Sequence, residues 1–436
     1  MRLKAALIGT GIAVLAASAP AHATVTNCSP VTVRLVYGGA TAINNSIRLA
    51  AEQVFGGVAQ CVKSGNQNSW RGLVDLNNDG IEETCAEFYL GVRGGSCEGV
   101  QQLDTADGSL VCDLNNPAGP AVDSLAVLGL PVNIAGADNE SANCPIPPTH
   151  AFAAIDGSGN PRFAVGAFVT ILNDGITSLG WDPAKDGFSR DSSAGTWGAL
   201  GWCDWKNVAP ARLTSSAAIA PVWRSLTSGT RVIYQQVIAK DLTQGFSTLT
   251  QPGTGDVIYA VNNNLTPLDQ RVCSTNPAQQ CGNNPAASSF FCDDGVTPCQ
   301  SAARPFFCAN FVPAGSPKFT AGWVGGDRVT VTAGADGLLG TEDDFPVKGN
   351  ATDHYVTATY NGIAFSPEKI RNGKYTHWSY ENIYALAGGV APADRRALAV
   401  RIENAAKSLA TQSKGLIDIG TMSVERACDS CVVIPN

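Results

Sequence analysis

Histidine and charged side chains are both scarce in this sequence. Only four of the 436 residues are histidines, and Asp, Glu, Lys and Arg together make up 15% of the chain. The Gly-x-Ser-x-Gly segment that carries the nucleophile of many serine hydrolases is absent. The histidines are also too scattered to indicate a Ser-His-Asp arrangement from their spacing. With no recognisable nucleophile or metal-ligand set, we expect a protein that is not an enzyme.

Long hydrophobic runs and an excess of basic residues are missing as well. After the first 23 residues no stretch is long and apolar enough to span a bilayer as a helix. Acidic residues outnumber basic ones by 37 to 29, which gives a net charge of −8. Nucleic acids and anionic membranes attract basic surfaces, so we expect no nucleic-acid partner and no membrane insertion. A small anion is not excluded, because a few local donors are enough to bind one.

The first 23 residues have the pattern of a secretory signal peptide. Arg2 and Lys4 supply the positive end, a short apolar stretch follows, and Ala21-His22-Ala23 has the form of a cleavage site. A membrane anchor is the alternative, and the shortness of the apolar run argues against it. No cysteine directly follows the cleavage site, so a lipid anchor is not indicated. We expect a periplasmic or secreted protein from which residues 1–23 are cleaved.

The cysteines fit this export. All 14 follow the predicted cleavage site, and their number is even. Several cluster in a Cys-rich segment at 271–310, and Cys428 and Cys431 form a CDSC sequence near the end of the chain. Zinc is the alternative use of such spacings, but no histidine neighbours the CxxC. We therefore expect disulfides throughout, in pairs that the sequence does not specify.

Two segments repeat the order strand, glycine turn, helix. In the first, over 31–55, a run rich in valine leads to GGAT and then to apolar residues at helical spacing. The second covers 214–242 and contains the stretch RSLTSGTR. The longest helical pattern is 390–415, with a proline near its start and Gly415 just past its end. Such units predict an α/β fold.

The stretch RSLTSGTR places anion-binding groups where a helix begins. A helix N-terminus has unpaired backbone N–H groups and a partial positive charge. Hydroxyl groups on Ser228 and Thr230 can donate to an oxyanion, Gly229 lets the backbone approach it, and Arg224 offers a planar fork. An ordinary helix cap is the alternative for this stretch alone. A ligand-facing arginine would not hold the core, so Arg224→Ala is expected to leave stability nearly unchanged.

These segments resemble the ligand loops of periplasmic phosphate-binding proteins, the solute receptors of ABC transporters. RSLTSGT resembles their R-x-x-x-S-G-T segment, and YGGATAINN resembles their first ligand loop. GGSCEG, at 94–99, resembles a Gly-Ser-Gly-x-Gly segment with Cys97 in place of the middle glycine. The stretch 360–386 resembles their closing region, with Thr376 where proline is usual. The segments follow the family order over most of the chain.

The resemblance implies a type II periplasmic-binding-protein fold, with two α/β lobes, a hinge and here a Cys-rich insertion. The implied ranges are 24–135 and 346–436 for lobe 1 and 136–345 for lobe 2. A small anion, phosphate first, would bind between the lobes, and an ABC-transporter membrane component would be the partner. A secreted protein that reuses the fold for attachment or surface assembly is the alternative. The ligand contacts carried over by position are Ala40, Thr41, Arg224, Ser228, Gly229 and Thr230.

The family also uses an aspartate that accepts the proton of hydrogen phosphate. A carboxylate that can only accept hydrogen bonds rejects a fully deprotonated anion such as sulfate. No segment of this sequence matches that position clearly. Asp138 is our first candidate and Asp123 our second.

A separate acidic stretch, DLNNDGIEE at 75–83, resembles a calcium-binding loop. Asp75, Asn77 and Asp79 alternate along it and a glycine follows. The twelfth loop position is Ala86, however, and Glu87 comes one residue late. Asn-Asp-Gly is also well suited to a hairpin turn, so a polar turn without metal is the alternative. No other cofactor is expected.

Overall fold

The computed structural model describes residues 28–436 except 65, 92–93, 158, 198–202, 210–211, 226, 239–248, 252, 266–289, 292–297, 300–311, 314 and 410–414. The predicted signal peptide and nearly all of the Cys-rich segment at 271–310 lie outside the described residues. Within the described part of the chain, no helix combines the length and the apolar character that crossing a membrane would require.

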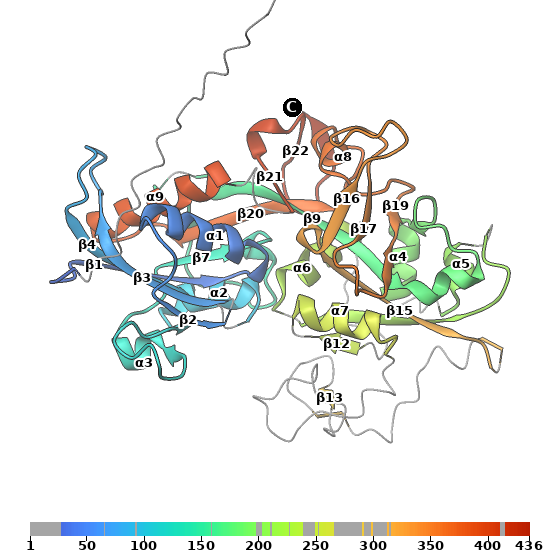
Figure 1. Ribbon diagram of the computed structural model, residues 1–436, viewed down its shortest axis with the longest axis horizontal. Helices are drawn as coiled ribbons and strands as arrows, with labels where there is room; N and C mark the ends of the chain where they lie inside the picture. Colours follow the sequence, from blue (N-terminus) through green and yellow to red (C-terminus); the bar gives the residue numbers. More distant parts are fainter. Residues whose placement is uncertain are drawn as a thin grey trace, which may run out of the picture.

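A large mixed sheet runs through both halves of the molecule (Figure 1). Its strands, in spatial order, are β12 (Leu249–Gln251), β11 (Ala218–Arg224), β15 (Lys318–Gly325), β9 (Arg162–Asn173), β20 (Trp378–Leu386), β7 (Ile134–Ala137), β1 (Val33–Gly39), β4 (Thr84–Gly91), β3 (Gln67–Val74) and β2 (Cys61–Ser64). Three short strands pair at its middle: β8 (Phe152–Ala153), β18 (Tyr355–Thr357) and β21 (Leu416–Ile417). The strands that pair with β1 and with β11 run parallel to them, and most other strand pairs are antiparallel. This mixed sheet with its helices confirms the predicted α/β class.

The chain passes between the two halves along β9 and β20. The start of β9 pairs with β20 as far as Ala167, and its remainder, from Phe168 on, pairs with β15. In Figure 1 both long strands run from the half that contains β1 to the half that contains β15. The halves are therefore joined by continuous backbone at the point where their sheets meet.

In the first half, helices cover both faces of the sheet. Strand residues alternate between the two faces: Leu35 belongs to the core beneath α1 (Thr41–Val54) and α9 (Ala393–Leu409), whereas Val36 belongs to the core beneath α2 (Ser96–Thr105). This alternation follows from the two-residue period of a strand. Helix α1 buries Ile43, Ile47, Ala50 and Ala51, which lie on one helical face as the sequence predicts.

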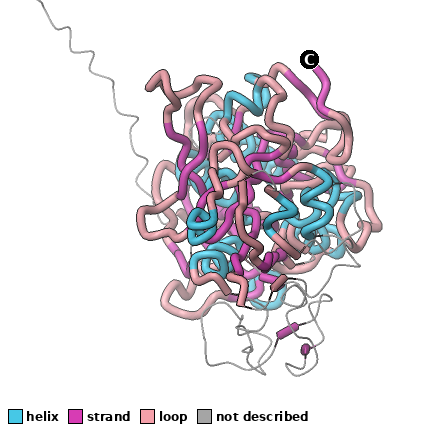
Figure 2. Tube along the Cα trace, turned by 90° about the vertical axis from the view of Figure 1, so that its right-hand side faces the viewer, coloured by secondary structure: helices cyan, strands magenta, loops and turns pink. Residues whose placement is uncertain are grey.

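The second half is built in the same way around β11. Val222 packs with α7 (Thr254–Asn262) on one face. Trp223 packs on the other face with α4 (Arg190–Trp197), α5 (Trp205–Val208) and α6 (Gly229–Ile238). Seen from the side, the strands run through the middle of the molecule, with helices and loops around them (Figure 2).

The remaining elements are short. The helices among them are α3 (Ser124–Leu128) and α8 (Pro367–Arg371). The paired strands are β5 (Leu110–Val111) with β6 (Val122–Asp123), β10 (Gly187–Phe188) with β19 (Thr359–Tyr360), β13 (Phe290–Phe291) with β14 (Pro298–Cys299), β16 (Val329–Thr332) with β17 (Phe345–Lys348), and β22 (Val424–Arg426) with β23 (Val433–Pro435).

The structure pairs the described cysteines in disulfides. Disulfides join Cys28 to Cys85, Cys61 to Cys112, Cys97 to Cys144, and Cys428 to Cys431. No cysteine is free among the residues that the structure describes. The described cysteines are therefore oxidised, as the sequence predicts. Cys97, which stands where the similar family segment has a glycine, is one of the paired residues.

Removing a long-range disulfide should cost more stability than removing a local one. The Cys97–Cys144 bond spans 47 residues and Cys428–Cys431 spans three. By loop-closure entropy, the double serine variant of the first pair should lose about 4 kcal/mol and that of the second about 2 kcal/mol. Urea unfolding of both variants measures this. Equal losses would show that the bonds act through local packing instead.

Candidate functional site

Two helix N-termini of the first half lack a side-chain cap. The N-cap residues are Ala40 for α1 and Gly95 for α2, and no side-chain hydrogen bond satisfies either end. The N–H group of Ala40 donates instead to the carbonyl oxygen of Gly136, at 2.8 Å, which ties the start of α1 to the end of β7. Uncapped helix starts have N–H groups available for an anion.

The start of α2 touches the second half of the molecule. The N–H group of Cys97 donates to the carbonyl oxygen of Thr227, at 3.1 Å, just before α6 begins. Val232 of α6 belongs to the same buried cluster as Val100 of α2. The first turns of α2 and α6 therefore lie against each other where the halves meet.

Asp138 lies at this junction and joins both halves. It follows β7 directly, and only 2% of its surface is exposed. Its Oδ1 accepts a hydrogen bond from Ser96 at the start of α2, and its Oδ2 accepts one from Thr230 of α6, at 3.3 Å. A Cβ atom at position 229 would overlap the Asp138 carboxylate, so the close approach of α6 requires glycine there.

Arg224 brings positive charge to the same region. It ends β11, is 3% exposed, and donates from Nη1 to Oγ1 of Thr254, at 2.6 Å. Arg231 supports it by donating to its carbonyl oxygen at 3.1 Å while stacking over the Trp223 ring. Burial lowers the pKa of Arg224 to about 10, and the carboxylates of Asp138 and Asp256 oppose that shift.

The carboxyl group of Asp138 is subject to opposing effects. Burial is the largest effect and raises the pKa of Asp138 overall, whereas the Ser96 hydrogen bond, the charge of Arg224 and the Thr230 hydrogen bond lower it in part. A buried acceptor beside a buried cation, with hydroxyl groups and helix N-termini around both, can bind an oxyanion that carries a proton. The oxyanion would be held by Arg224 and its proton by Asp138.

The structure brings most of the predicted site residues together. Asp138, Gly229 and Thr230 are in direct contact, and Arg224 acts on Asp138 through its charge. Ser228 is buried one position before α6, and its N–H group donates to the carbonyl oxygen of Ser225 at 3.0 Å. Ala40 is linked to β7 as described above, and Thr41 is the first residue of α1.

Asp123, the second candidate for the acidic residue, lies elsewhere. Its carboxylate caps α3 by accepting hydrogen bonds from the N–H groups of Leu125, at 3.0 Å, and Ala126, at 2.9 Å. This is the ordinary use of aspartate at a helix start. Of the two candidates, only Asp138 is in the cluster.

The predicted calcium loop forms the turn between β3 and β4, far from this junction in Figure 1. Asp75 accepts hydrogen bonds from the N–H groups of Asn78 and Gly80 and pairs with Arg401, at 3.3 Å. Asn77 and Asp79 bond to each other, at 2.9 Å. No group of three or more His, Cys, Asp or Glu side chains in the described part of the chain is arranged to hold a metal ion. Calcium binding stays a prediction, and the turn is stabilised by its own hydrogen bonds.

Two hydroxyl residues of the cluster, Ser96 and Thr254, are not among the site residues predicted from the sequence. Ser96 bonds to Asp138, and Thr254 bonds to Arg224. The sequence could have indicated Ser96, because it follows Gly94 and Gly95 at the start of a helix. Thr254 begins α7, and nothing in its local sequence connects it to Arg224.

Comparison with known proteins gives matches only among solved structures. No family model matches the sequence, and no curated protein does. The fold is similar to a substrate-binding protein from Clostridium perfringens, named for phosphate ABC transport and solved with bound phosphate (TM-score 0.45, 10% identity, 88% of this chain and 99% of that one). It is also similar to an ABC-type phosphate transport receptor from Vibrio cholerae (TM-score 0.44, 11% identity, 88% of this chain and 99% of that one). A third similar structure is PstS from Borrelia burgdorferi (TM-score 0.35, 11% identity, 89% of this chain and 99% of that one). At this level the likeness does not establish the family of the chain.

Proposed function

We propose that this chain is an exported binding protein for a small oxyanion, with phosphate as the first candidate, held where its two halves meet. The observation that carries the proposal is the buried Asp138, which accepts hydroxyl hydrogen bonds from Ser96 of one half and Thr230 of the other beside the charge of Arg224. A ligand bound there would contact groups from both halves at once.

The chemistry of the cluster favours an anion that keeps a proton. An ionised carboxylate accepts hydrogen bonds and donates none, so it pairs with the O–H of hydrogen phosphate and repels sulfate. Arg224 and the N-termini of α1 and α6 then supply donors for the remaining oxygens. The N–H groups of Cys97 and Glu98 at the start of α2 already donate to backbone carbonyl oxygens. The ligand set proposed from the described residues is Ala40, Thr41, Ser96, Asp138, Arg224, Ser228, Gly229 and Thr230.

The remaining parts of the proposal follow from this receptor role. Lobe 1 would comprise 24–135 and 346–436, lobe 2 would comprise 136–345, and the signal peptide at 1–23 would direct the chain to the periplasm or the exterior. An ABC-transporter membrane component would take up the released ligand. The protein would bind its ligand without converting it.

Calorimetry on the purified mature protein tests the function. Phosphate should bind with one site per chain, and a tenfold excess of sulfate should not displace it. Turnover of a chromogenic phosphate ester should be absent. If neither anion binds, the receptor proposal is wrong, and a role in attachment or surface assembly becomes the better hypothesis.

A further inference from the structure

A second buried carboxyl group lies beside Asp138. Strands β7 and β20 are antiparallel, and their last pair joins Ala137 to Asn382. The next residues along the two strands are Asp138 and Glu381, so their backbones are neighbours, and the charge of Asp138 acts on the Glu381 carboxyl group. Glu381 is only 1% exposed. Nothing in the strand sequence WSYENIYAL distinguishes this glutamate from an ordinary surface residue.

Among the described residues, no cation or hydrogen-bond donor is paired with the Glu381 carboxyl group. Oε1 lies over the backbone of Gly166 in β9, where any larger residue would overlap it. Oε2 accepts no hydrogen bond from any described residue. The charged groups that act most strongly on Glu381 are all carboxylates: Asp138, Asp327 and Asp429.

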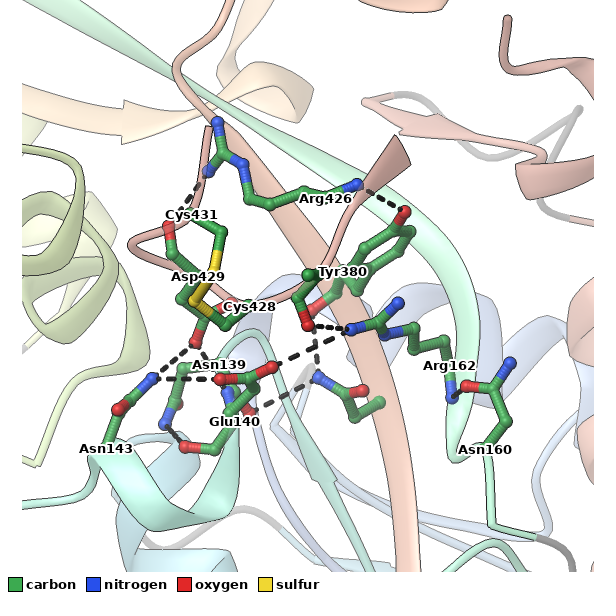
Figure 3. A network of polar contacts seen from close by, with 12 residues as sticks. Asn139, Glu140, Asn143, Asn160, Arg162, Tyr380, Arg426, Cys428, Asp429 and Cys431 are labelled. Atoms are coloured by element: carbon green, nitrogen blue, oxygen red, sulfur yellow. Dashed lines mark hydrogen bonds and ion pairs between the residues drawn. A yellow bond between two sulfur atoms is a disulfide. The ribbon is translucent and has the colours of Figure 1, made fainter. Parts of the chain in front are cut away.

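The last of these carboxylates belongs to the loop that the Cys428–Cys431 disulfide closes (Figure 3). Asp429 accepts hydrogen bonds from the N–H group of Glu140, at 2.7 Å, and from Asn143, at 2.9 Å. Arg426 anchors the loop by donating to the carbonyl oxygens of Asp429 and Trp378. The loop thus fixes a further acidic group whose charge acts on Glu381.

A buried hydroxyl group completes the cluster. The Tyr37 side chain of β1 is fully buried, and its hydroxyl lies over the backbone of Gly136, two residues before Asp138. It has no hydrogen-bond partner among the described residues. Burial raises the pKa of Tyr37, as do the nearby charges of Glu381 and Asp138. Tyr37 is therefore an O–H donor without an acceptor.

Resting on the function proposed above, we propose that Glu381 is a specificity-determining residue of the anion site, retained as a neutral carboxylic acid beside an ionised Asp138. Two adjacent buried carboxyl groups do not both ionise, and Asp138 has the cation and the hydroxyl donors. The site then offers one acceptor, at Asp138, and two neutral donors, at Glu381 and Tyr37. Such a set fits a tetrahedral oxyanion that has both a proton and free oxygens.

Protonation of Glu381 couples anion binding and stability to pH. Burial first, and then the charges of Asp138, Asp327 and Asp429, hold the pKa of Glu381 well above its ordinary value. Over the range between the ordinary and the raised pKa, the folded protein keeps a proton that the unfolded chain releases. Stability contributed by this group therefore falls as pH rises above the ordinary range and becomes constant only above the raised pKa.

The variant Glu381→Gln keeps the shape and neutrality of the acid and removes the titration. Phosphate affinity of the two proteins should agree at neutral pH. As pH rises towards about 9, wild type should lose affinity by at least about tenfold once Glu381 ionises beside the ligand, and the variant should not. Calorimetric titrations from about pH 6 to about pH 9 measure this divergence, and they stay below the pKa of Arg224, which is about 10.

Thermal melts without ligand give a second readout. The melting temperature of Glu381→Gln should exceed that of wild type by an amount that grows as pH rises through the same range. Glu87→Gln is the matched control: Glu87 is equally buried but pairs with Arg34 and Arg71, so its loss should destabilise the protein at every pH tested.

Each outcome decides a different point. Much tighter phosphate binding by Glu381→Gln at neutral pH would mean that Glu381 is ionised there, and the inference would be wrong. Parallel binding and melting profiles at all pH values would also overturn it. If wild type does not bind phosphate, the receptor function fails and the specificity role falls with it, whereas the melts still report whether the buried acid is protonated.

Discussion

Replacing Asp138 with asparagine should cut the preference for phosphate over sulfate by at least about tenfold. A hydrogen bond to a charged acceptor contributes about 1.5–3 kcal/mol and one to a neutral acceptor about 0.5–1.5 kcal/mol, so hydrogen phosphate loses affinity. Sulfate gains, because the carboxylate that repels it is gone. Competition calorimetry with both anions on wild type and Asp138→Asn measures the ratio.

Asp123→Asn is the matched control for this experiment. Asp123 caps α3 away from the site, and asparagine caps a helix about as well as aspartate. Both its anion affinities and its melting temperature should equal those of wild type. Equal changes in phosphate and sulfate binding by Asp138→Asn would contradict a proton-accepting role for Asp138.

The local pieces of the fold and half of the site could be predicted from the sequence. Periodicity gave the strand and helix of the 31–55 unit, which the structure has as β1 and α1, and those of the 214–242 unit, which are β11 and α6. RSLTSGTR is contiguous, so its arginine, hydroxyls and glycine could be assigned to one helix start before any tertiary contact was known.

The other half of the site depends on contacts that local sequence does not encode. Asp138 and Glu381 become neighbours only because β7 pairs with β20, more than 240 residues later in the chain. The sequence ranked Asp138 before Asp123, but it did not show that Asp138 is buried against Ser96 and Thr230.

Replacing Arg224 with alanine should weaken phosphate binding by at least about tenfold. A charge-assisted hydrogen bond contributes about 1.5–3 kcal/mol, and the fork of the guanidinium is lost with it. Arg224→Lys should recover only part of the affinity, because an ammonium group cannot donate along two parallel directions. Calorimetry on the two variants, with Arg48→Ala on the outer surface of α1 as control, measures both effects.

The burial of Arg224 changes the expectation for stability. From the sequence, an arginine facing an open cleft would leave stability unaffected, but this side chain is 3% exposed and lies near the carboxyl groups of Asp138 and Asp256. Alanine leaves those acids without a cation, which should cost about 3 kcal/mol. Acid pH should reduce this loss, since protonating the two carboxyl groups removes the uncompensated charge. A loss of stability that does not depend on pH, with phosphate affinity intact, would mean that Arg224 only packs the start of α6 and does not bind an anion.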